Sequence, residues 1–217
     1  MARRALPATT AVLTATAALL LTACGGSGGS ASSDAIKGPG KGQGSPPAPA
    51  SASASSGPER PEITITDSFR LTFENWTSSD RGEQAVLTDA REELRAGYAA
   101  IIENDPDSEA VAFYDTEGVL GQTKEWIKSY TDKNLTVIGK LPAFDPKVTL
   151  APNGRGASLS YCTDETDAKT RNRKTGKVEG NPAGTNPYVR YSVSLTKNAQ
   201  GVWQNSSLHG ERGGCSR

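Results

Sequence analysis

The stretch YVRYSVSLTK, residues 188–197, alternates apolar and polar side chains along its whole length. A period of two is typical of a strand that has one face against a core and the other toward solvent. A turn-forming run, Asn198 to Gly201, follows this strand and leads into the apolar pair Val202 and Trp203. The C-terminal half of the chain therefore predicts an antiparallel sheet. Similar strand patterns occur upstream, at residues 135–137, 148–150 and 157–162.

The region before residue 134 has the longer period of helices. Between Gln84 and Asn104, apolar side chains recur every three or four residues, and Asp105-Pro106 ends the pattern. Helices followed by strands predict an α+β domain. The expected elements are a strand around residues 71–73 and helices over 84–104, 108–114 and 119–130, with N-cap candidates for the first helix at residues 77–80.

Several segments resemble those of a group of actinobacterial secreted or lipid-anchored proteins, namely AREELRAGYAAIIENDPDSEAVAFY, EWIKSY, SYCTDE, KTGKV, YSVSLTKNAQGVWQ and ERGGC. The order of elements is also similar to the cone of nuclear transport factor 2, ketosteroid isomerase and the SnoaL-like cyclases, a cystatin-like architecture. This resemblance implies three N-terminal helices packed on a curved antiparallel sheet within residues 62–217. It implies no activity, because one fold hosts many unrelated functions.

The N-terminus has the order of an export signal. Arg3 and Arg4 precede an apolar run, Ala11 to Leu21, which is too short for a membrane-spanning helix of about 20 residues. Leu21-Thr22-Ala23-Cys24 resembles a bacterial lipobox, so we expect residues 1–23 to be a signal peptide and Cys24 to carry the lipid, diacylglyceryl and palmitate chains included. The alternative is an ordinary secretory signal with an incidental cysteine. The paired arginines leave the general and twin-arginine export routes both open.

Residues 24–61 have the composition of a disordered tether. Of the 37 residues from 25 to 61, 30 are Gly, Ser, Ala or Pro, and Ile36 is the only large apolar side chain. Such a segment cannot bury enough apolar surface to offset the entropy lost on ordering. The predicted arrangement is therefore a lipid anchor in the cell membrane, a disordered linker, and one domain held on the extracytoplasmic side.

Two further cysteines, Cys162 and Cys215, lie in the folded region. An even number of cysteines in an exported protein favours a disulfide, here one that closes a loop of about 54 residues. Two free thiols or a metal pair are the alternatives, and the second is poorly supported because His209 is the only histidine. No cofactor is expected, and the acidic run Asp105 to Glu109 is explained by the dipole of a helix N-terminus.

The resemblance suggests where catalytic residues would lie. Isomerases and cyclases of this cone place an aspartate, histidine or tyrosine in its interior, where burial raises a carboxyl pKa. The candidates are Tyr114, Asp115, Tyr161, Asp164 and His209. Each has a structural interpretation as well: Tyr161 belongs to the apolar set of its strand, the two aspartates lie at the ends of elements, and the histidine lies near a strand end. No spacing among them defines a dyad, so no catalytic residue is assigned.

Charge is unevenly distributed along the domain. Residues 61–117 contain 4 basic and 14 acidic side chains, and residues 118–217 contain 15 and 8, so the total of −3 gives no reason to expect nucleic acid. The polar insert Asp167 to Pro187 is expected to protrude as a mobile loop of little importance for stability. Opposite charges can simply pair within the fold; the alternative is contact with an anionic polymer through Lys169, Arg171, Arg173, Lys174 and Lys177.

These observations predict a lipid-anchored domain of the cell envelope that binds a small apolar ligand, an envelope protein or a polymer without catalysis. The alternative is an envelope enzyme of the isomerase or cyclase type. The interior of the cone distinguishes the two hypotheses. An exclusively apolar lining would favour binding, whereas a buried carboxylate or His209 projecting inward would favour proton transfer.

Overall fold

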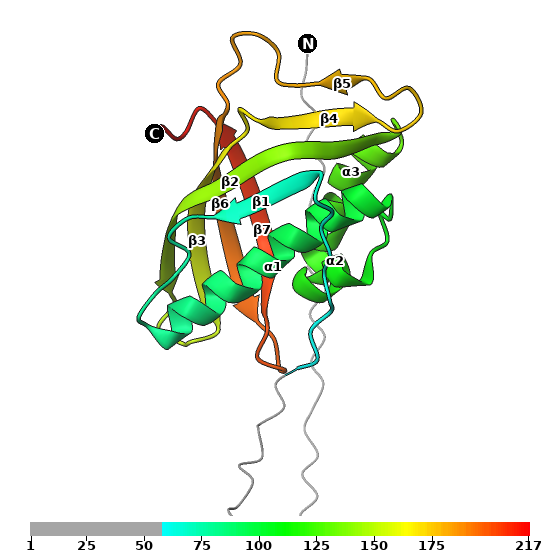
Figure 1. Ribbon diagram of the computed structural model, residues 1–217. Coiled ribbons are helices and arrows are strands. Elements are labelled where there is room, and N and C mark those ends of the chain that lie inside the picture. Colours follow the sequence, from blue (N-terminus) through cyan, green and yellow to red (C-terminus); the bar gives the residue numbers. More distant parts are fainter. Residues whose placement is uncertain (1–57) are drawn as a thin grey trace, which may run out of the picture. The chain divides into compact units, whose positions relative to one another are not determined.

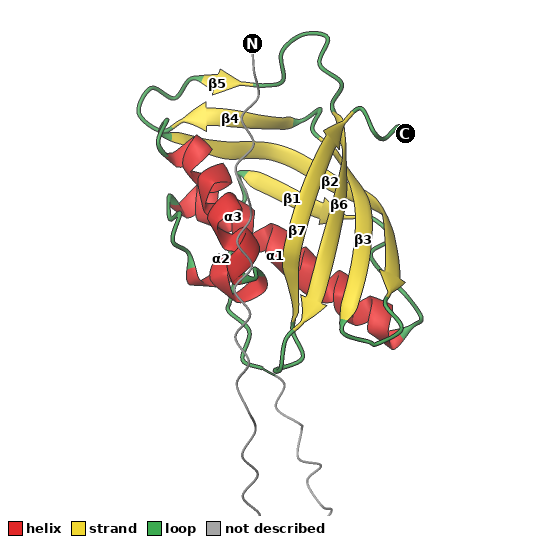
Figure 2. Ribbon diagram, turned by 180° about the vertical axis from the view of Figure 1, so that it is seen from behind, coloured by secondary structure: helices red, strands yellow, loops and turns green. Residues whose placement is uncertain are grey.

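A computed structural model describes residues 58–217 of the protein. The predicted signal peptide, Cys24 and almost all of the predicted tether lie outside these residues. Within them, three helices accompany one curled seven-stranded sheet (Figures 1 and 2), which confirms the α+β class. No helix in this part of the chain is long and apolar enough to cross a membrane.

The helices are α1 (Arg81–Glu103), α2 (Glu109–Tyr114) and α3 (Glu117–Thr131). The strands are β1 (Phe69–Phe73), β2 (Leu135–Leu150), β3 (Gly156–Asp164), β4 (Ala168–Asn172), β5 (Val178–Glu179), β6 (Tyr188–Lys197) and β7 (Trp203–Arg212). α1 begins three residues before the predicted Gln84, because the Asp80 carboxylate accepts hydrogen bonds from the backbone N–H groups of Gly82 and Glu83.

The strands lie in the order β5-β4-β2-β3-β6-β7, and β1 pairs with β2 outside this path. β1 and β2 run parallel, with Phe69 opposite Gly139 and Phe73 opposite Ala143. The prediction of a wholly antiparallel sheet is therefore wrong at this pair. The physical reason is the connection: all three helices lie between β1 and β2, and such a long crossover returns the chain in the direction in which it left.

β2 is one long strand where the sequence suggested two short apolar segments. Its first part pairs with β4 and its last part with β3. The register with β3 shifts between Phe144 and Lys147, where Asp145 has a φ of 52°. An irregularity of this kind bends a strand and increases its twist. β2 can therefore curl around the helices and belong to both ends of the sheet (Figure 1).

α1 supplies one wall of two adjoining hydrophobic clusters. Near its start, Val86 packs with Leu159 of β3 and Val193 of β6. Near its end, Ile101 packs with Ile127 of α3 and with residues of α2, β1 and β2. Burying such side chains removes apolar surface from water at roughly 25 cal/mol per Å². The helix thus separates a sheet-facing cluster from a cluster shared with the other two helices.

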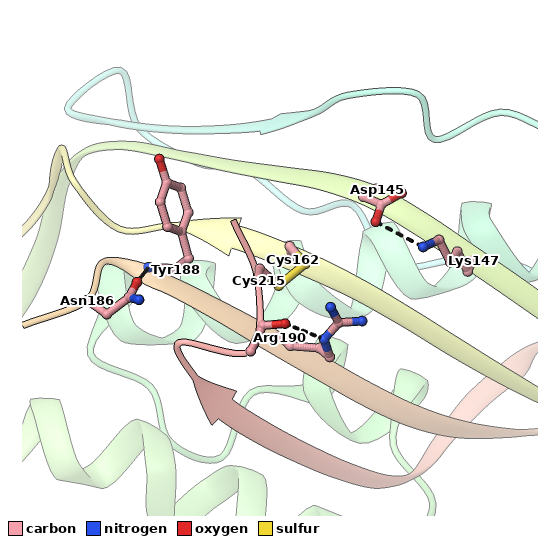
Figure 3. The surroundings of a disulfide bond; sticks show 8 residues. Asp145, Lys147, Cys162, Asn186, Tyr188, Arg190 and Cys215 are labelled. Atoms are coloured by element: carbon pink, nitrogen blue, oxygen red, sulfur yellow. Dashed lines mark hydrogen bonds and ion pairs between the residues drawn. A yellow bond between two sulfur atoms is a disulfide. The ribbon is translucent and has the colours of Figure 1, made fainter. Parts of the chain in front are cut away.

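The disulfide between Cys162 and Cys215 is present, as predicted, and its two Cα atoms are 6.2 Å apart. Figure 3 shows it joining β3 to the segment that follows β7. Next to it, Arg190 donates from Nε to the carbonyl oxygen of Gly214 at 2.7 Å. The Arg217 guanidinium lies over the Phe144 ring, 4.2 Å from its centroid. The last residues of the chain are therefore fastened to the sheet.

The insert Asp167 to Pro187 contains β4 and β5 rather than a featureless loop. β4 pairs with β2, and Arg173 reaches the C-terminal end of α1, where its guanidinium donates to the carbonyl oxygens of Ile101 and, at 2.9 Å, Ile102. These carbonyl groups lie in the last turn of a helix, where the helix dipole favours a cation. The expectation that the whole insert is unimportant for stability is therefore wrong for Arg173.

Replacing Arg173 by Ala is expected to lower the free energy of unfolding by about 1 kcal/mol, because two charge-assisted hydrogen bonds to helix carbonyl groups are lost. Lys174→Ala is a matched control, since the neighbouring Lys174 is exposed. Urea denaturation of both variants measures the difference. Equal stability of the two variants would contradict a capping role for Arg173.

Candidate functional site

A cavity of about 200 Å³ lies between α1, α3 and strands β3, β6 and β7. α1 and α3 approach closely here, because Gly97 lies against the Trp126 ring, where a Cβ atom would be 2.9 Å from Cζ3. Gln122 is exposed and marks the rim. The lining consists of Glu93, Leu94, Gly97, Tyr98, Val119, Gln122, Thr123, Trp126, Tyr161, Tyr191 and Leu208.

Four aromatic side chains dominate this lining, and they contact one another in pairs. Tyr161 of β3 stacks on Tyr191 of β6 with ring centroids 5.2 Å apart, and Tyr98 of α1 meets Trp126 of α3 edge to face at 5.4 Å. Such pairs add about 0.5–1.5 kcal/mol beyond their burial and fix the orientation of the rings. The cavity therefore has a largely preformed aromatic wall.

Glu93 is the only lining residue with an acidic or basic side chain. The Asn205 amide donates to its carboxylate at 3.5 Å. Asp115, which is 3% exposed, lies close behind it at the end of α2 and forms an isolated β-bridge with Asn205. The backbone N–H of Thr116 donates to the Asn205 carbonyl at 2.9 Å, so β7 holds the junction of α2 and α3 in place.

Both carboxyl groups have pKa values above their ordinary range. Burial is the main cause for Glu93, whose pKa rises to about 8, and the negative charge of Asp115 raises it further while Asn205 lowers it. Burial raises the pKa of Asp115 to about 6, against the stabilising effect of Thr123 and Asn205 on its ionised form. Two such close groups titrate as a unit. Near neutral pH the pair therefore holds about one proton, which belongs mainly to Glu93.

The pair predicts how stability depends on pH. A folded-state pKa above the unfolded value means that the folded protein binds protons more tightly, so the stabilisation is complete below about pH 4 and is lost as pH rises through 6 and 8. Urea denaturation between about pH 4 and pH 9 should show this decline. Glu93→Gln should reduce it, whereas Glu103→Gln, at an exposed position of the same helix, should not. A decline unchanged in Glu93→Gln would contradict the assignment.

The candidates identified from the sequence lie in different places. Tyr161 lines the cavity and Asp115 lies behind it. Tyr114 is fully buried near Arg60 and Asp89 and does not line the cavity. Asp164 accepts hydrogen bonds from Thr166 at the end of β3, and His209 is exposed on β7. Only two of the five candidates are therefore associated with this site.

The sequence analysis missed Glu93, although the pattern contained a signal. The inward face of α1 includes Val86, Ala90, Gly97 and Ala100, and Glu93 falls in this series at helical spacing. A carboxylate within an apolar stripe is unusual, because burying a charge without compensation is costly. That position could have been flagged before Asp164 or His209.

The basic residues of the insert do not form one free surface. Arg173 binds the end of α1, and Lys177 pairs with Glu179 at 2.6 Å. Lys169, Arg171 and Lys174 are exposed. Lys169 and Arg171 alternate with the less exposed Ala168 and Thr170 along β4, so they share one face of the strand. Within residues 58–217 there is also no group of three or more His, Cys, Asp or Glu side chains arranged to hold a metal ion.

No protein-family model matches this chain, and no curated protein matches its sequence. Among solved structures, the chain is similar to a ketosteroid isomerase-like protein from Erwinia carotovora atroseptica, with 16% identity, a TM-score of 0.41 and coverage of 60% of this chain and 95% of that one. ActVI-ORFA from Streptomyces coelicolor gives 10%, 0.41, 61% and 98%, and Aln2 from another Streptomyces strain gives 12%, 0.43, 58% and 90%. At these identities and TM-scores, no functional residue is carried over to this chain.

Proposed function

We propose that the domain binds a small ring-sized molecule in the cavity between α1, α3 and the sheet, and that Glu93 exchanges a proton with it. The supporting observation is a carboxyl group with a raised pKa that faces an aromatic cavity. Cavities of about 150 Å³ accommodate benzene, so about 200 Å³ accommodates one substituted ring. This reaction class is the isomerase or cyclase type that the sequence analysis kept as its alternative.

The arrangement suits general acid–base chemistry near neutral pH. A catalytic group works best when its pKa lies close to the working pH, and burial together with the charge of Asp115 brings the pKa of Glu93 there. Asn205 donates to the Glu93 carboxylate and so limits its orientation. Asp115 does not line the cavity, and its role is to raise the proton affinity of Glu93.

Base-catalysed opening of 5-nitrobenzisoxazole tests this proposal. Glu93 would remove the proton from the ring carbon, the C–H electrons would form the nitrile as the N–O bond breaks, and the product is a coloured cyanophenolate. Glu93→Gln should lower kcat/KM by about 100-fold or more, the usual contribution of a positioned base. Asp115→Asn should move the pH profile to lower pH, because the charge that raises the pKa of Glu93 is gone.

Asp164→Asn serves as the control, since Asp164 lies at a strand end and does not line the cavity. Turnover that survives in Glu93→Gln would reject proton transfer by Glu93. Binding of the probe without turnover would favour the second candidate, a non-catalytic binding domain. The observation behind that candidate is the lining itself, in which Glu93 is the only acidic or basic side chain.

The cellular setting is part of the same proposal. A nuclear transport factor 2-like domain, anchored through lipid on Cys24 and displayed outside the cytoplasmic membrane, accords with the N-terminal sequence. The exposed cations Lys169, Arg171 and Lys174 are the remaining candidates for contact with an anionic polymer. Loss of membrane retention in Cys24→Ala would support the anchor, and unchanged retention would reject it.

A further inference from the structure

The charge around the cavity is entirely negative. Its lining contains Glu93 and no Lys or Arg, and the carboxyl group nearest to Glu93 is that of Asp115. The cations on the neighbouring helices are engaged elsewhere. Arg95 binds Glu92 and the Ile63 carbonyl, and Lys124 binds Asp107. The two buried carboxyl groups therefore have no cationic partner within the described residues that line or back the cavity.

Asp115 is the clearer case of an uncompensated group. It is 3% exposed, and neither of its carboxylate oxygens accepts a hydrogen bond within residues 58–217. A buried carboxylate without a partner is costly, and a cation placed nearby offsets that cost. The molecule thus holds an acidic pocket that a positively charged ligand would complement.

The aromatic wall supports the same charge preference. Tyr98, Trp126, Tyr161 and Tyr191 surround the space next to Glu93. The face of an aromatic ring attracts a cation by about 0.5–2 kcal/mol, most strongly for Trp and when water is excluded. Several rings combined with a carboxylate are the elements with which proteins recognise quaternary ammonium groups.

We propose that the cavity selects a small organic cation, a quaternary or protonated amine about the size of choline, held between the four aromatic rings and the Glu93 carboxylate. This inference rests on the proposed function, because it names the class of molecule that occupies the same cavity. The volume of about 200 Å³ sets the upper size of that molecule.

Cation binding should be coupled to proton release. The polar and titratable groups that face Glu93 are Asp115 from α2, Thr123 from α3, Tyr161 from β3, Tyr191 from β6, Asn205 from β7 and Tyr98 from α1 itself. A bound cation favours ionised Glu93, which is largely protonated at neutral pH. The affinity should therefore rise with pH up to about 8 and level off above it.

Choline and 3,3-dimethylbutan-1-ol test the proposal, because they have nearly the same shape and differ in charge. Calorimetry on the purified protein should show choline binding at least about tenfold more tightly than the alcohol. In buffers of different ionisation heat, choline should release up to one proton and the alcohol none. A quaternary ammonium ion does not titrate, so any proton released comes from the protein.

Glu93→Gln should abolish the proton release and the preference for choline while keeping weak binding of the alcohol. Trp126→Leu should weaken choline more than the alcohol. Retained alcohol binding shows in each case that the variant is folded. Equal affinity for the two compounds in the wild-type protein would overturn the inference.

Inhibition separates this inference from the proposed function. Choline should compete with 5-nitrobenzisoxazole for the cavity. Glu93-dependent turnover that choline does not inhibit would overturn the cation proposal and leave the proton-transfer proposal intact. The absence of turnover together with selective choline binding would do the reverse.

Discussion

Replacing Arg60 by Met is expected to lower the free energy of unfolding by about 3 kcal/mol, the lower end of the range for breaking a buried ion pair. Asp89 on α1 is 1% exposed on its side chain, and Arg60 donates to its Oδ1 from Nε at 3.1 Å and from Nη2 at 2.7 Å. The other oxygen accepts the backbone N–H of Trp203 at 2.9 Å. Without Arg60, the protein buries an unpaired charge. The lower end applies because Arg60 itself is 37% exposed, so water can reach the site.

Arg91→Met is the matched control, because Arg91 lies on the same helix with similar exposure and only a long 3.8 Å contact with Glu92. Its effect should stay within about 0.5 kcal/mol, as for other surface positions. Chemical denaturation at neutral pH measures both variants. Similar losses in the two variants would contradict a special role for Arg60.

The position of Arg60 also corrects the boundary between tether and domain. The predicted domain begins at residue 62, yet Arg60 binds the core and Arg95 holds the Ile63 carbonyl at 2.8 Å. Composition could not reveal this, because Pro58 to Pro61 contains nothing apolar enough to signal packing. A long-range ion pair between Arg60 and Asp89 leaves no periodic pattern in the sequence.

Periodicity was a good guide to the elements of the fold. The alternation at Tyr188–Lys197 and the three-to-four spacing of α1 reflect burial of one face, which physics imposes directly on the sequence. The parallel pairing of β1 and the continuity of β2 were missed. Both depend on contacts between segments far apart in the chain, to which local patterns are blind.

The site was predicted less well than the fold. Tyr161 and Asp115 were among the candidates, but nothing in their spacing brings them to Glu93, because α1, α2, β3 and β7 converge only in three dimensions. The raised pKa values arise from burial, which is a property of the folded protein. A carboxylate on an apolar helix face was the one local indication.

The second large effect concerns the disulfide. Changing both Cys162 and Cys215 to Ala is expected to lower the free energy of unfolding by about 4 kcal/mol, because the bond closes a loop of 53 residues and restricts the unfolded chain. Both cysteines are buried, so Ala is a better replacement than a polar residue. Urea denaturation should show a lower midpoint. It should also show a larger m-value, since the unlinked chain exposes more surface when unfolded.

Reduction of the wild-type protein is the independent measurement, and the reduced protein should unfold at nearly the midpoint of the double variant. The tail keeps other contacts, among them the pair between Arg217 and Glu74 at 2.7 Å and the bond from Arg190 to Gly214, so the folded structure should survive the loss of the covalent bond. Arg217→Ala in the oxidised protein tests those contacts separately and should cost at most about 1 kcal/mol, as for an exposed ion pair. If the double variant and the reduced wild-type protein both kept the oxidised midpoint and m-value, the bond would contribute nothing, and the noncovalent contacts of the tail alone would hold β3 and the C-terminus together.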